Sequence, residues 1–438
     1  MRFVSVRARL GRALALAALT VLGGSAAARA EPAAELLPPL REPGAPYRTP
    51  RAGEGFHTQL FGDPIEITPR DRRSVTALQV GSAFTAPGPS GAEVIPYGAL
   101  FLFRRPDPDH FLEAILIGIQ NDVLFARSPR GFGPFEYLLT LETSTVPVAR
   151  SDLVGGERLK EEQLLWGFVR GGLGFGYRTD VAPGAADNMF SAALLVQPGF
   201  FFFDDGSDTR DDFVVPRDTF ELRARLRVTH DAFERNLLEM VHRGFGFGLD
   251  ASIGHRARWN DWGVQAREKA GSTQTFASLL GYAKFAAGLP GASERHRLIG
   301  ALHFTVGDDL DRFSAPRIGG GPDGDEFKAI ARPLIPGAVI EEFHPKHYVV
   351  ALAEYRYELL FFTYLSLRTS LTWLDRDRLR AGTVRHENDW LPSLGARITT
   401  GFPPRLWLRL DYNYNFGVIR RGDELGGHEV VLALAREF

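Results

Sequence analysis

The chain of 438 residues is nearly balanced in charge, with 51 Lys and Arg against 53 Asp and Glu and a formal net charge of -2. This balance gives no electrostatic basis for nucleic-acid binding. The absence of cysteine from the sequence excludes disulfides, thiolate metal sites and a cysteine-linked acyl anchor.

Residues 1–30 have the parts of a secretory signal peptide. Arginines within residues 1–12 precede the short apolar run 13–22, and the triplet Ala-Arg-Ala at 28–30 fits a cleavage site. The apolar run is too short to cross about 30 Å of hydrocarbon as a helix. We therefore predict a signal peptide and export to the outer membrane of a Gram-negative bacterium.

Residues 31–55 are rich in proline, alanine and charge, and we expect them to form an extended periplasmic arm or linker. Residues 56–438 consist of short strand patterns separated by turn patterns. No later stretch approaches the roughly 18 apolar residues that a spanning helix needs. Any crossing of the membrane must therefore be made by strands.

The clearest strand pattern lies in residues 406–416. Even-numbered positions are apolar or aromatic, whereas odd-numbered positions from Arg409 to Asn415 are polar, with Trp407 as the exception. Residues 221–229 and 351–359 alternate in the same way. An apolar face and a polar face with period two are typical of a transmembrane β-barrel, and in lipid the sheet must close because every backbone polar group needs a partner.

Sixteen candidate strands follow from this pattern, and the number is even, as in bacterial barrels. They are 56–67, 74–84, 95–103, 111–125, 135–146, 161–178, 188–203, 218–229, 242–259, 273–287, 296–306, 347–359, 362–375, 390–400, 405–417 and 427–438. The sequence thus predicts an all-β fold, a transmembrane antiparallel β-barrel over 56–438, which we expect to be a monomer in contact with outer-membrane lipid. The segments 111–119 and 200–203 are apolar on both faces and are expected to face a plug or a crowded lumen.

The C-terminal strand of such a barrel ends in the periplasm, and this fixes the direction of every other strand. Periplasmic turns are then expected at 179–187, 288–295, 359–362 and 401–404, and outside loops at 204–217, 260–272, 307–346, 376–389 and 418–426. The longest loop, 307–346, joins the eleventh and twelfth predicted strands. A short pairing between 56–67 and 427–438 would make the seam of the barrel a gate.

These features resemble the BamA/TamA superfamily of outer-membrane barrels. Residues 317–320 read Arg-Ile-Gly-Gly, like the R-[IL]-G-G of the family's long loop, and residues 354–357 read Glu-Tyr-Arg-Tyr, like the E-Y-R-[FY] of its next strand. Residues 371–375 lie where the family often has F-V-D. The resemblance covers residues 300–438, and the first half of the chain only by its number of strands.

The resemblance implies translocation or assembly of protein or lipid through a lumen partly plugged by loop 307–346. It places Arg317, Gly319 and Gly320 in that loop, and Glu354 and Arg356 at the lumen. The chain departs from the family in two ways. The loop lacks the family's R-G-[FY] motif, and the arm is too short for a periplasmic repeat domain, so the chain would be a barrel-only member with a possible periplasmic partner.

Several arginines have lumen parity in their strands, and two interpretations remain open for them. They could favour anions in the lumen, or they could form ion pairs across strands and hold a filled interior. We favour the second interpretation because charges of both signs share the same face. The arginines are Arg223, Arg225, Arg227, Arg356, Arg368, Arg397 and Arg409, and the expected acidic partners are Glu221, Glu354, Glu358 and Asp411.

Other motifs give weaker signals. The carboxylates in 204–212 and 308–326 match no calcium-loop spacing, so they are expected to be solvated, and Gly319-Gly320-Gly321 lacks a phosphate-loop pattern, so it is expected to be a sharp turn.

His344 and His347 would lie on opposite faces of an extended strand, and a shared metal ion would need a turn at Pro345. Ser366, Ser370 and His303 have no triad spacing. We expect no enzyme activity, metal or cofactor. A diffusion channel and a lipid-modifying enzyme at the barrel rim remain as alternatives.

Overall fold

The computed structural model describes residues 47–437, apart from 61–62, 89–90, 108, 118–119, 128–131, 145–148, 323–332, 381–382, 403–405 and 421–423. The predicted signal peptide and the first part of the predicted arm lie outside the described residues. No helix in the described part of the chain has both the length and the apolar character needed to cross a membrane.

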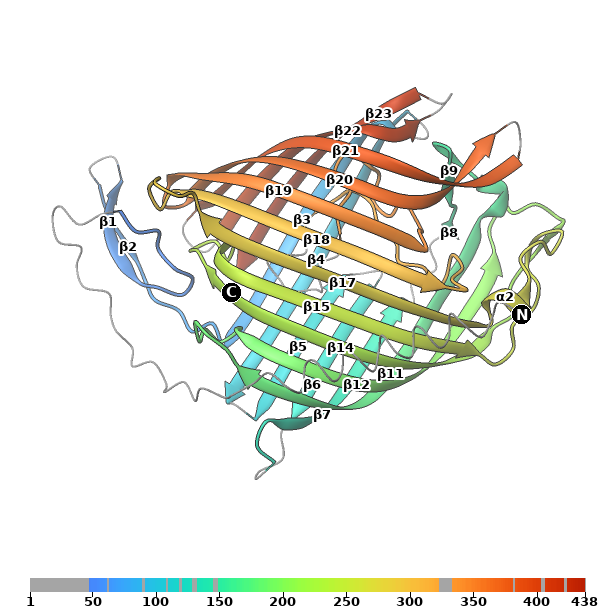
Figure 1. Ribbon diagram of the computed structural model, residues 1–438, viewed down its shortest axis with the longest axis horizontal. Helices are drawn as coiled ribbons and strands as arrows, with labels where there is room; N and C mark the ends of the chain where they lie inside the picture. Colours follow the sequence, from blue (N-terminus) through green and yellow to red (C-terminus); the bar gives the residue numbers. More distant parts are fainter. Residues whose placement is uncertain are drawn as a thin grey trace. The chain divides into compact units, whose positions relative to one another are not determined.

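In the described residues, sixteen long strands form one closed antiparallel barrel, and the two-residue strand β8 (Ala149–Arg150) follows β7 along the edge of β11 (Figure 1). Each long strand pairs with its neighbour in sequence, and β23 pairs with β3 to close the sheet. The long strands are β3 (Ser74–Gly88), β4 (Gly91–Asp107), β5 (His110–Ile117), β6 (Gln120–Arg127), β7 (Phe135–Ser144), β11 (Leu164–Asp180), β12 (Met189–Asp205), β14 (Thr219–Arg235), β15 (Val241–Arg256), β17 (Thr275–Gly288), β18 (His296–Asp308), β19 (His347–Leu360), β20 (Thr363–Arg380), β21 (Thr383–Phe402), β22 (Leu406–Arg420) and β23 (Glu424–Glu437).

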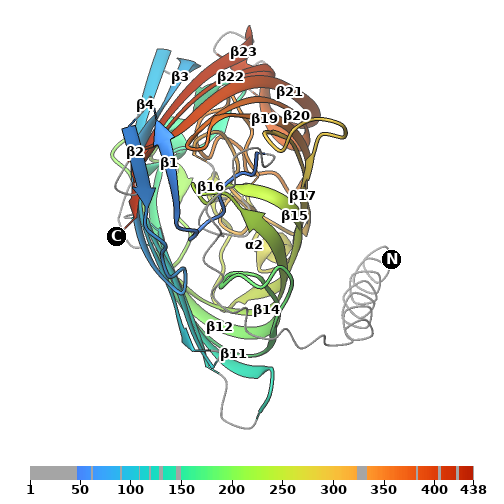
Figure 2. The ribbon, with the colours of Figure 1, turned by 90° about the vertical axis from the view of Figure 1, so that its left-hand side faces the viewer.

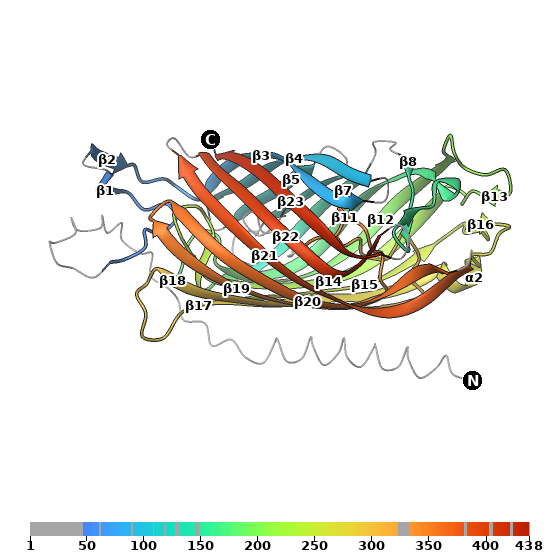
Figure 3. The same cartoon turned by 90° about the horizontal axis from the view of Figure 1, so that it is seen from above.

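Short elements lie at the two ends of the barrel. The hairpin β1 (Phe56–Leu60) and β2 (Asp63–Ile67) is a separate two-stranded sheet at one end, and β13 (Phe213–Val214), β16 (Gly263–Val264) and α2 (Ala270–Thr273) lie at the opposite end (Figure 3). The remaining elements are β9 (Leu153–Val154), β10 (Glu157–Arg158) and η1 (Lys160–Glu162).

Two predicted strands are wrong, and the two errors cancel in the total. Residues 56–67 are not the first barrel strand, because they form two five-residue strands that pair with each other and are too short to cross a bilayer. Residues 111–125 are not one strand but parts of β5 and β6, which pair with each other. Because residues 111–119 are apolar on both faces, the pattern did not reveal where one strand ends and the next begins. The loop 307–346 still joins the eleventh and twelfth barrel strands.

The strands near the loop end are longer than predicted. The predicted loops 376–389 and 418–426 are wrong in extent, because β20 continues to Arg380 and β23 begins at Glu424. Spanning the bilayer takes about 9–11 tilted residues. These strands, of 18 and 14 residues, therefore extend beyond the hydrocarbon layer. Backbone pairing between strands can continue there even though the side chains are polar.

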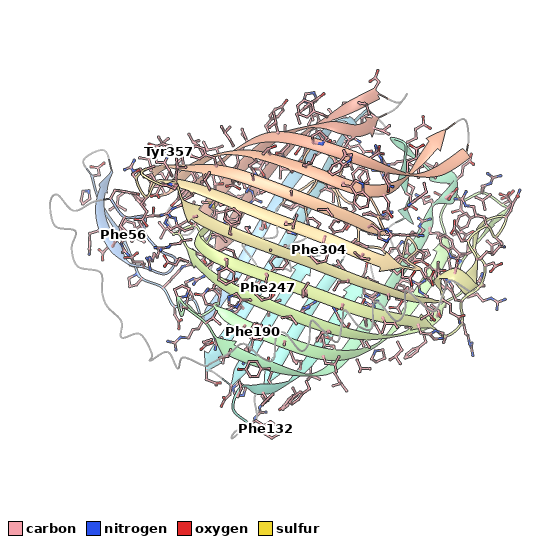
Figure 4. The ribbon with its side chains drawn as sticks, viewed as in Figure 1. Phe56, Phe132, Phe190, Phe247, Phe304 and Tyr357 are labelled. Carbon is pink, nitrogen blue, oxygen red and sulfur yellow. The ribbon has the colours of Figure 1, made fainter. Side chains whose placement is uncertain are left out.

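The outer surface of the barrel is apolar. Phe247 on β15 and Phe304 on β18 lie on this surface (Figure 4). Exposed large apolar side chains occur around the sheet, including Leu78, Val80, Leu139, Leu173, Phe175, Leu194, Val196, Phe245, Ile253, Phe285, Leu302, Leu367, Leu371, Leu394, Leu410 and Leu432. A continuous belt of this kind is stable only against hydrocarbon. The predicted transmembrane β-barrel is therefore confirmed.

The seam between β3 and β23 is well paired. Its register runs without a shift over ten positions, from His428 opposite Ala86 to Glu437 opposite Ala77, whereas β6 and β7 pair over seven positions. The Tyr97 hydroxyl also donates to the Leu432 carbonyl across the intervening strand, at 3.0 Å. This contact requires Gly81 on β3, because a Cβ there would lie 2.5 Å from that hydroxyl.

The predicted short pairing at the seam is therefore wrong. Residues 56–67 do not contact the last strand as a barrel neighbour, and β3 takes that place with continuous pairing. A gate that opens by separating these two strands would have to break the whole ladder.

Candidate functional site

The interior of the barrel contains ion pairs between neighbouring strands. Arg225 on β14 bonds to Asp250 on β15 at 2.5 Å and to Glu142 on β7 at 2.6 Å. Arg227 lies 3.4 Å from the same Asp250 carboxylate. Arg225 thus links β14 to its neighbour β15 and to β7, from which β11 and β12 separate it in the sheet, through charge-assisted bonds that are stronger than neutral hydrogen bonds.

Glu221 is the most enclosed acid of this group. Its carboxylate is fully buried and lies 2.8 Å from Arg170, 3.2 Å from Arg223 and 3.4 Å from Arg256. Arg256 also bonds to Asp311 of the loop that follows β18, at 2.6 Å. Asp311 was expected to be a solvated loop carboxylate. That expectation is wrong for this residue, because the loop folds back and brings it to a buried guanidinium.

A second group of charges lies on β19 to β22. Arg397 bonds to both oxygens of Asp411 at 2.6 and 2.7 Å, and Arg368 and Arg409 lie 3.7 and 3.9 Å from the same carboxylate. Arg356 bonds to Glu354 at 2.7 Å.

The expected cross-strand ion pairs are thus present for Glu221 and Asp411, and Glu354 on β19 also lies 3.7 Å from Arg368 on β20. Among the described residues, Glu358 has no such ion pair and accepts hydrogen bonds from the hydroxyls of Tyr47 and Thr49. The sequence could not show this, because the partners come from a segment more than 300 positions earlier.

The loop between β18 and β19 folds back into the ring of strands (Figure 2). Ile318 forms an antiparallel bridge with Phe343, and Gly319 forms a parallel bridge with Leu334, so the two described arms of the loop pair with each other. Loop and wall share one buried apolar cluster, made of Ile318, Ile335, Ala338 and Phe343 from the loop and Tyr348, Val350, Leu374, Leu391 and Val418 from β19 to β22. Burial of this much apolar surface favours the docked position.

Glu429 on β23 binds the loop backbone. One carboxylate oxygen accepts the Gly321 N–H at 2.5 Å, and the other accepts the Gly337 N–H and the Asn413 side-chain amide at 3.0 Å each. The side chain is 1% exposed. Nearby, Asn415 donates to the Pro336 carbonyl at 2.9 Å.

The two glycines of the RIGG motif allow this close approach. A Cβ at Gly319 would lie 2.2 Å from the Val339 carbonyl oxygen, and a Cβ at Gly320 would lie 2.2 Å from both the Ala338 carbonyl oxygen and Glu429. The sequence predicted a sharp turn here. What the glycines allow in addition is contact with the inner wall of the barrel.

Arg420 and Glu342 form a further link between strand and loop. The two side chains bond at 2.7 Å, and Arg420 also donates to the Gly337 carbonyl at 3.1 Å. Both residues are buried. The sequence pointed to Glu342 only as an acid near His344 and His347, and it did not point to Arg420. The alternation within one strand carries no information about a partner 78 positions away.

Arg317 lies beside Trp166, near the start of β11. Its guanidinium lies 5.1 Å from the Trp166 ring, and it donates to the Arg312 carbonyl at 3.3 Å. Arg356 instead donates to the Val241 carbonyl at the start of β15, nearer the C-terminal end of the barrel.

An aromatic cluster that the sequence analysis missed anchors the beginning of the loop. Phe313 packs edge-on against Trp166 at 5.3 Å and against Phe203 at 4.9 Å between ring centroids. The buried members of the cluster are Leu164, Trp166, Phe201, Phe213, Trp259, Trp262 and Phe313. The apolar run 200–203 gave the one available signal, and its inward-facing residues contact the loop as expected.

His344 lies in the docked loop beside Asp152. Burial, together with the charge of Arg317, lowers the pKa of His344 from its ordinary value to about 3, although the carboxylate of Asp152 at 3.5 Å opposes the shift. Arg312 adds to the lowering, and Glu341 opposes it. The imidazole is therefore neutral in the docked loop at pH 7.

We expect the docked loop to weaken as the pH falls. A neutral docked histidine stabilises docking fully above its ordinary pKa of about 6.5, and each pH unit below that favours the released, protonated state by about 1.4 kcal/mol, or tenfold. Protease cleavage within residues 309–346 should thus rise from pH 7 to pH 5, and His344→Gln should remove most of the rise. An equal rise in both proteins would exclude His344 as its source.

The residues weighed for metal binding and catalysis do not form such sites. His344 faces Asp152, whereas His347 bonds to Asp375 at 2.9 Å. No group of metal-binding side chains occurs among the described residues. Ser366 donates to Glu354, Ser370 bonds to Ser393, and the His303 ring stacks on Tyr282, so these candidates are not brought together.

A closed sheet with an apolar outer surface and an ion-paired polar interior defines an outer-membrane β-barrel. Among solved structures, the chain is similar to BamA from Haemophilus ducreyi lacking POTRA domains 1–3, with 11% identity and a TM-score of 0.48 over 88% of this chain and 75% of that chain. It is also similar to CdiB from Escherichia coli, with 11% identity and a TM-score of 0.48 over 88% and 67% of the two chains.

CdiB from Acinetobacter baumannii is similar with 9% identity and a TM-score of 0.47, over 87% of this chain and 63% of that chain. No protein-family model matches the sequence, and no curated protein matches it. These likenesses concern the barrel fold, and the function proposed below follows from the residues of this chain.

Proposed function

We propose that this protein is a gated outer-membrane transport barrel that moves protein or lipid, and that loop 307–346 plugs its lumen at rest. The observation that carries the proposal is the attachment of the loop to the inner wall. Glu429 accepts two loop N–H groups, and Ile318 and Ile335 are buried against the strands. A surface loop without a role in the lumen would have no need of such contacts.

The pairing of β3 with β23 supports a route through the lumen and not through the seam. Continuous pairing over ten positions, with Tyr97 bonded across it, makes lateral opening costly. The loop, by contrast, is attached by side chains and could be released without breaking the barrel ladder.

A diffusion channel for small solutes is the second candidate. It requires a bore that the loop leaves open, and the ion pairs around Glu221 and Asp411 could then line a charged passage. An enzyme at the rim finds less support, because Ser366 and Ser370 are bonded to groups other than histidine.

Conductance across a planar bilayer tests the proposal. The purified full-length chain should show low or erratic conductance, and a variant with residues 311–345 replaced by a short Gly-Ser linker should show a large steady one. Heat-modified migration on SDS gels serves as the check that the variant barrel is folded. A large steady conductance of the unaltered chain would favour the diffusion channel, and a folded variant that stays closed would contradict the plug.

A further inference from the structure

A cavity of about 520 Å³ lies at the end of the barrel that holds the C-terminus, the end assigned to the periplasm. It is bounded by the β1–β2 hairpin and the chain that follows it, by the start of β3 and the end of β4, and by three turns between barrel strands. Its volume is within the range of about 300–1,000 Å³ that is usual for small-molecule sites.

The hairpin is held over this end of the barrel by several contacts. Phe56 lies on the hairpin (Figure 4). Its ring packs edge-on against Phe361 at 5.2 Å, and Arg70 forms ion pairs with Glu239 and Glu437. The contacts join the hairpin region to the turns of the barrel, so the cavity is a feature of the folded chain and not a gap beside a loose arm.

The lining of the cavity is mainly apolar, and the buried charges beside it are paired. Apolar lining residues include Ile65, Ile67, Phe101, Phe103, Leu238 and Trp407. Arg72 lies 2.8 Å from Asp187 and 2.6 Å from Glu239, and Arg235 lies 3.0 Å from Asp187. Because these cations already have carboxylate partners, the interior of the cavity favours an uncharged apolar occupant.

The cavity also reaches the lipid-facing surface. Its lining contains inward-facing residues, such as Ala435 and Gly401, and their outward-facing neighbours in sequence, Arg436 and Phe402. Alternate residues of a strand point to opposite faces of the sheet. The cavity therefore passes around the ends of β21 to β23 that lie near the C-terminus, from the mouth of the barrel to the membrane.

We propose that this cavity binds one acyl chain of a phospholipid from the periplasmic leaflet of the outer membrane. The chain enters around the edge between Phe402 and Arg436 and lies against Ile67, Phe103 and Trp407, while the headgroup stays at the membrane surface. A hydrocarbon chain matches the apolar lining, the paired charges and the opening toward lipid. The bound acyl chain would contact both the barrel and the hairpin, and none of these contacts involves loop 307–346. The proposal therefore does not rest on the proposed plug.

Photolabelling in a membrane tests the site. The full-length chain is reconstituted in phosphatidylethanolamine vesicles that contain a small share of the same lipid with a photoreactive acyl chain, and labelled residues are located by mass spectrometry. We expect label on the cavity-lining segments 65–77 and 99–105, in addition to the outer belt. Ile67→Trp, which fills the cavity from outside the barrel sheet, should lower the cavity label by about tenfold.

His57→Trp is the matched control, because His57 belongs to the same hairpin, is exposed and does not line the cavity. His57→Trp should leave the cavity label unchanged. The label at Leu367 on the outer surface should be the same in every variant. Ala435→Trp fills the cavity from the barrel side and should repeat the loss. Label confined to the outer belt, or cavity label that survives both filling substitutions in folded protein, would overturn the proposal.

Discussion

Glu429→Ala will release loop 307–346 and raise the conductance of the barrel. The substitution removes the acceptor for the N–H groups of Gly321 and Gly337 and leaves both buried without a partner. A buried donor left without a partner costs about 1–3 kcal/mol, so the docked loop should lose about 2–6 kcal/mol. Single-channel recordings in planar bilayers should show more frequent and longer open events than the unaltered chain does.

Glu424→Ala is the control for this experiment. Glu424 is an exposed glutamate at the loop end of the same strand, and its removal should leave the conductance unchanged. Glu429→Gln keeps an acceptor oxygen and should give an intermediate effect. If Glu429→Ala is folded and conducts no more than the Glu424→Ala protein, Glu429 does not hold the loop.

Asp411→Ala is expected to lower the stability of the barrel itself. Asp411 is 1% exposed, and its carboxylate is the shared partner of Arg397, Arg368 and Arg409. Without it, three buried guanidinium groups repel one another. Loss of one partner of a buried ion pair costs about 3–5 kcal/mol. Unfolding in urea from lipid vesicles, followed by tryptophan fluorescence, measures the change.

An exposed acid provides the comparison for Asp411. Asp212→Ala removes a carboxylate that pairs with Arg210 on the loop surface, where solvent screens the pair. Its unfolding midpoint should therefore stay close to that of the unaltered protein. An Asp411→Ala protein of similar stability would mean that water or a rearranged neighbour compensates the three arginines.

The period-two pattern of single strands was informative because it is local. Residues 406–416 show lipid-facing and lumen-facing rows directly, and the long segment at 307–346 could be located between two such strands. The glycines of the RIGG motif indicated a turn for the same reason, since backbone freedom belongs to the residue itself. The split of 111–125 could not be read, because residues 111–119 are apolar on both faces. The strand ends at 376–380 and 424–426 could not be read either, because polar residues there resemble a loop.

The sequence by itself determined that the chain forms a closed sheet in a membrane. It also determined which residues of the alternating strands face the lipid and which face the lumen. Only the tertiary structure decided that β3 replaces residues 56–67 at the seam, that Glu429 binds the loop, and that the hairpin leaves a cavity beside Trp407. The physical reason is that side-chain parity is set within one strand, whereas partners such as Glu429 and Gly321 are more than a hundred positions apart and meet only after the barrel has closed.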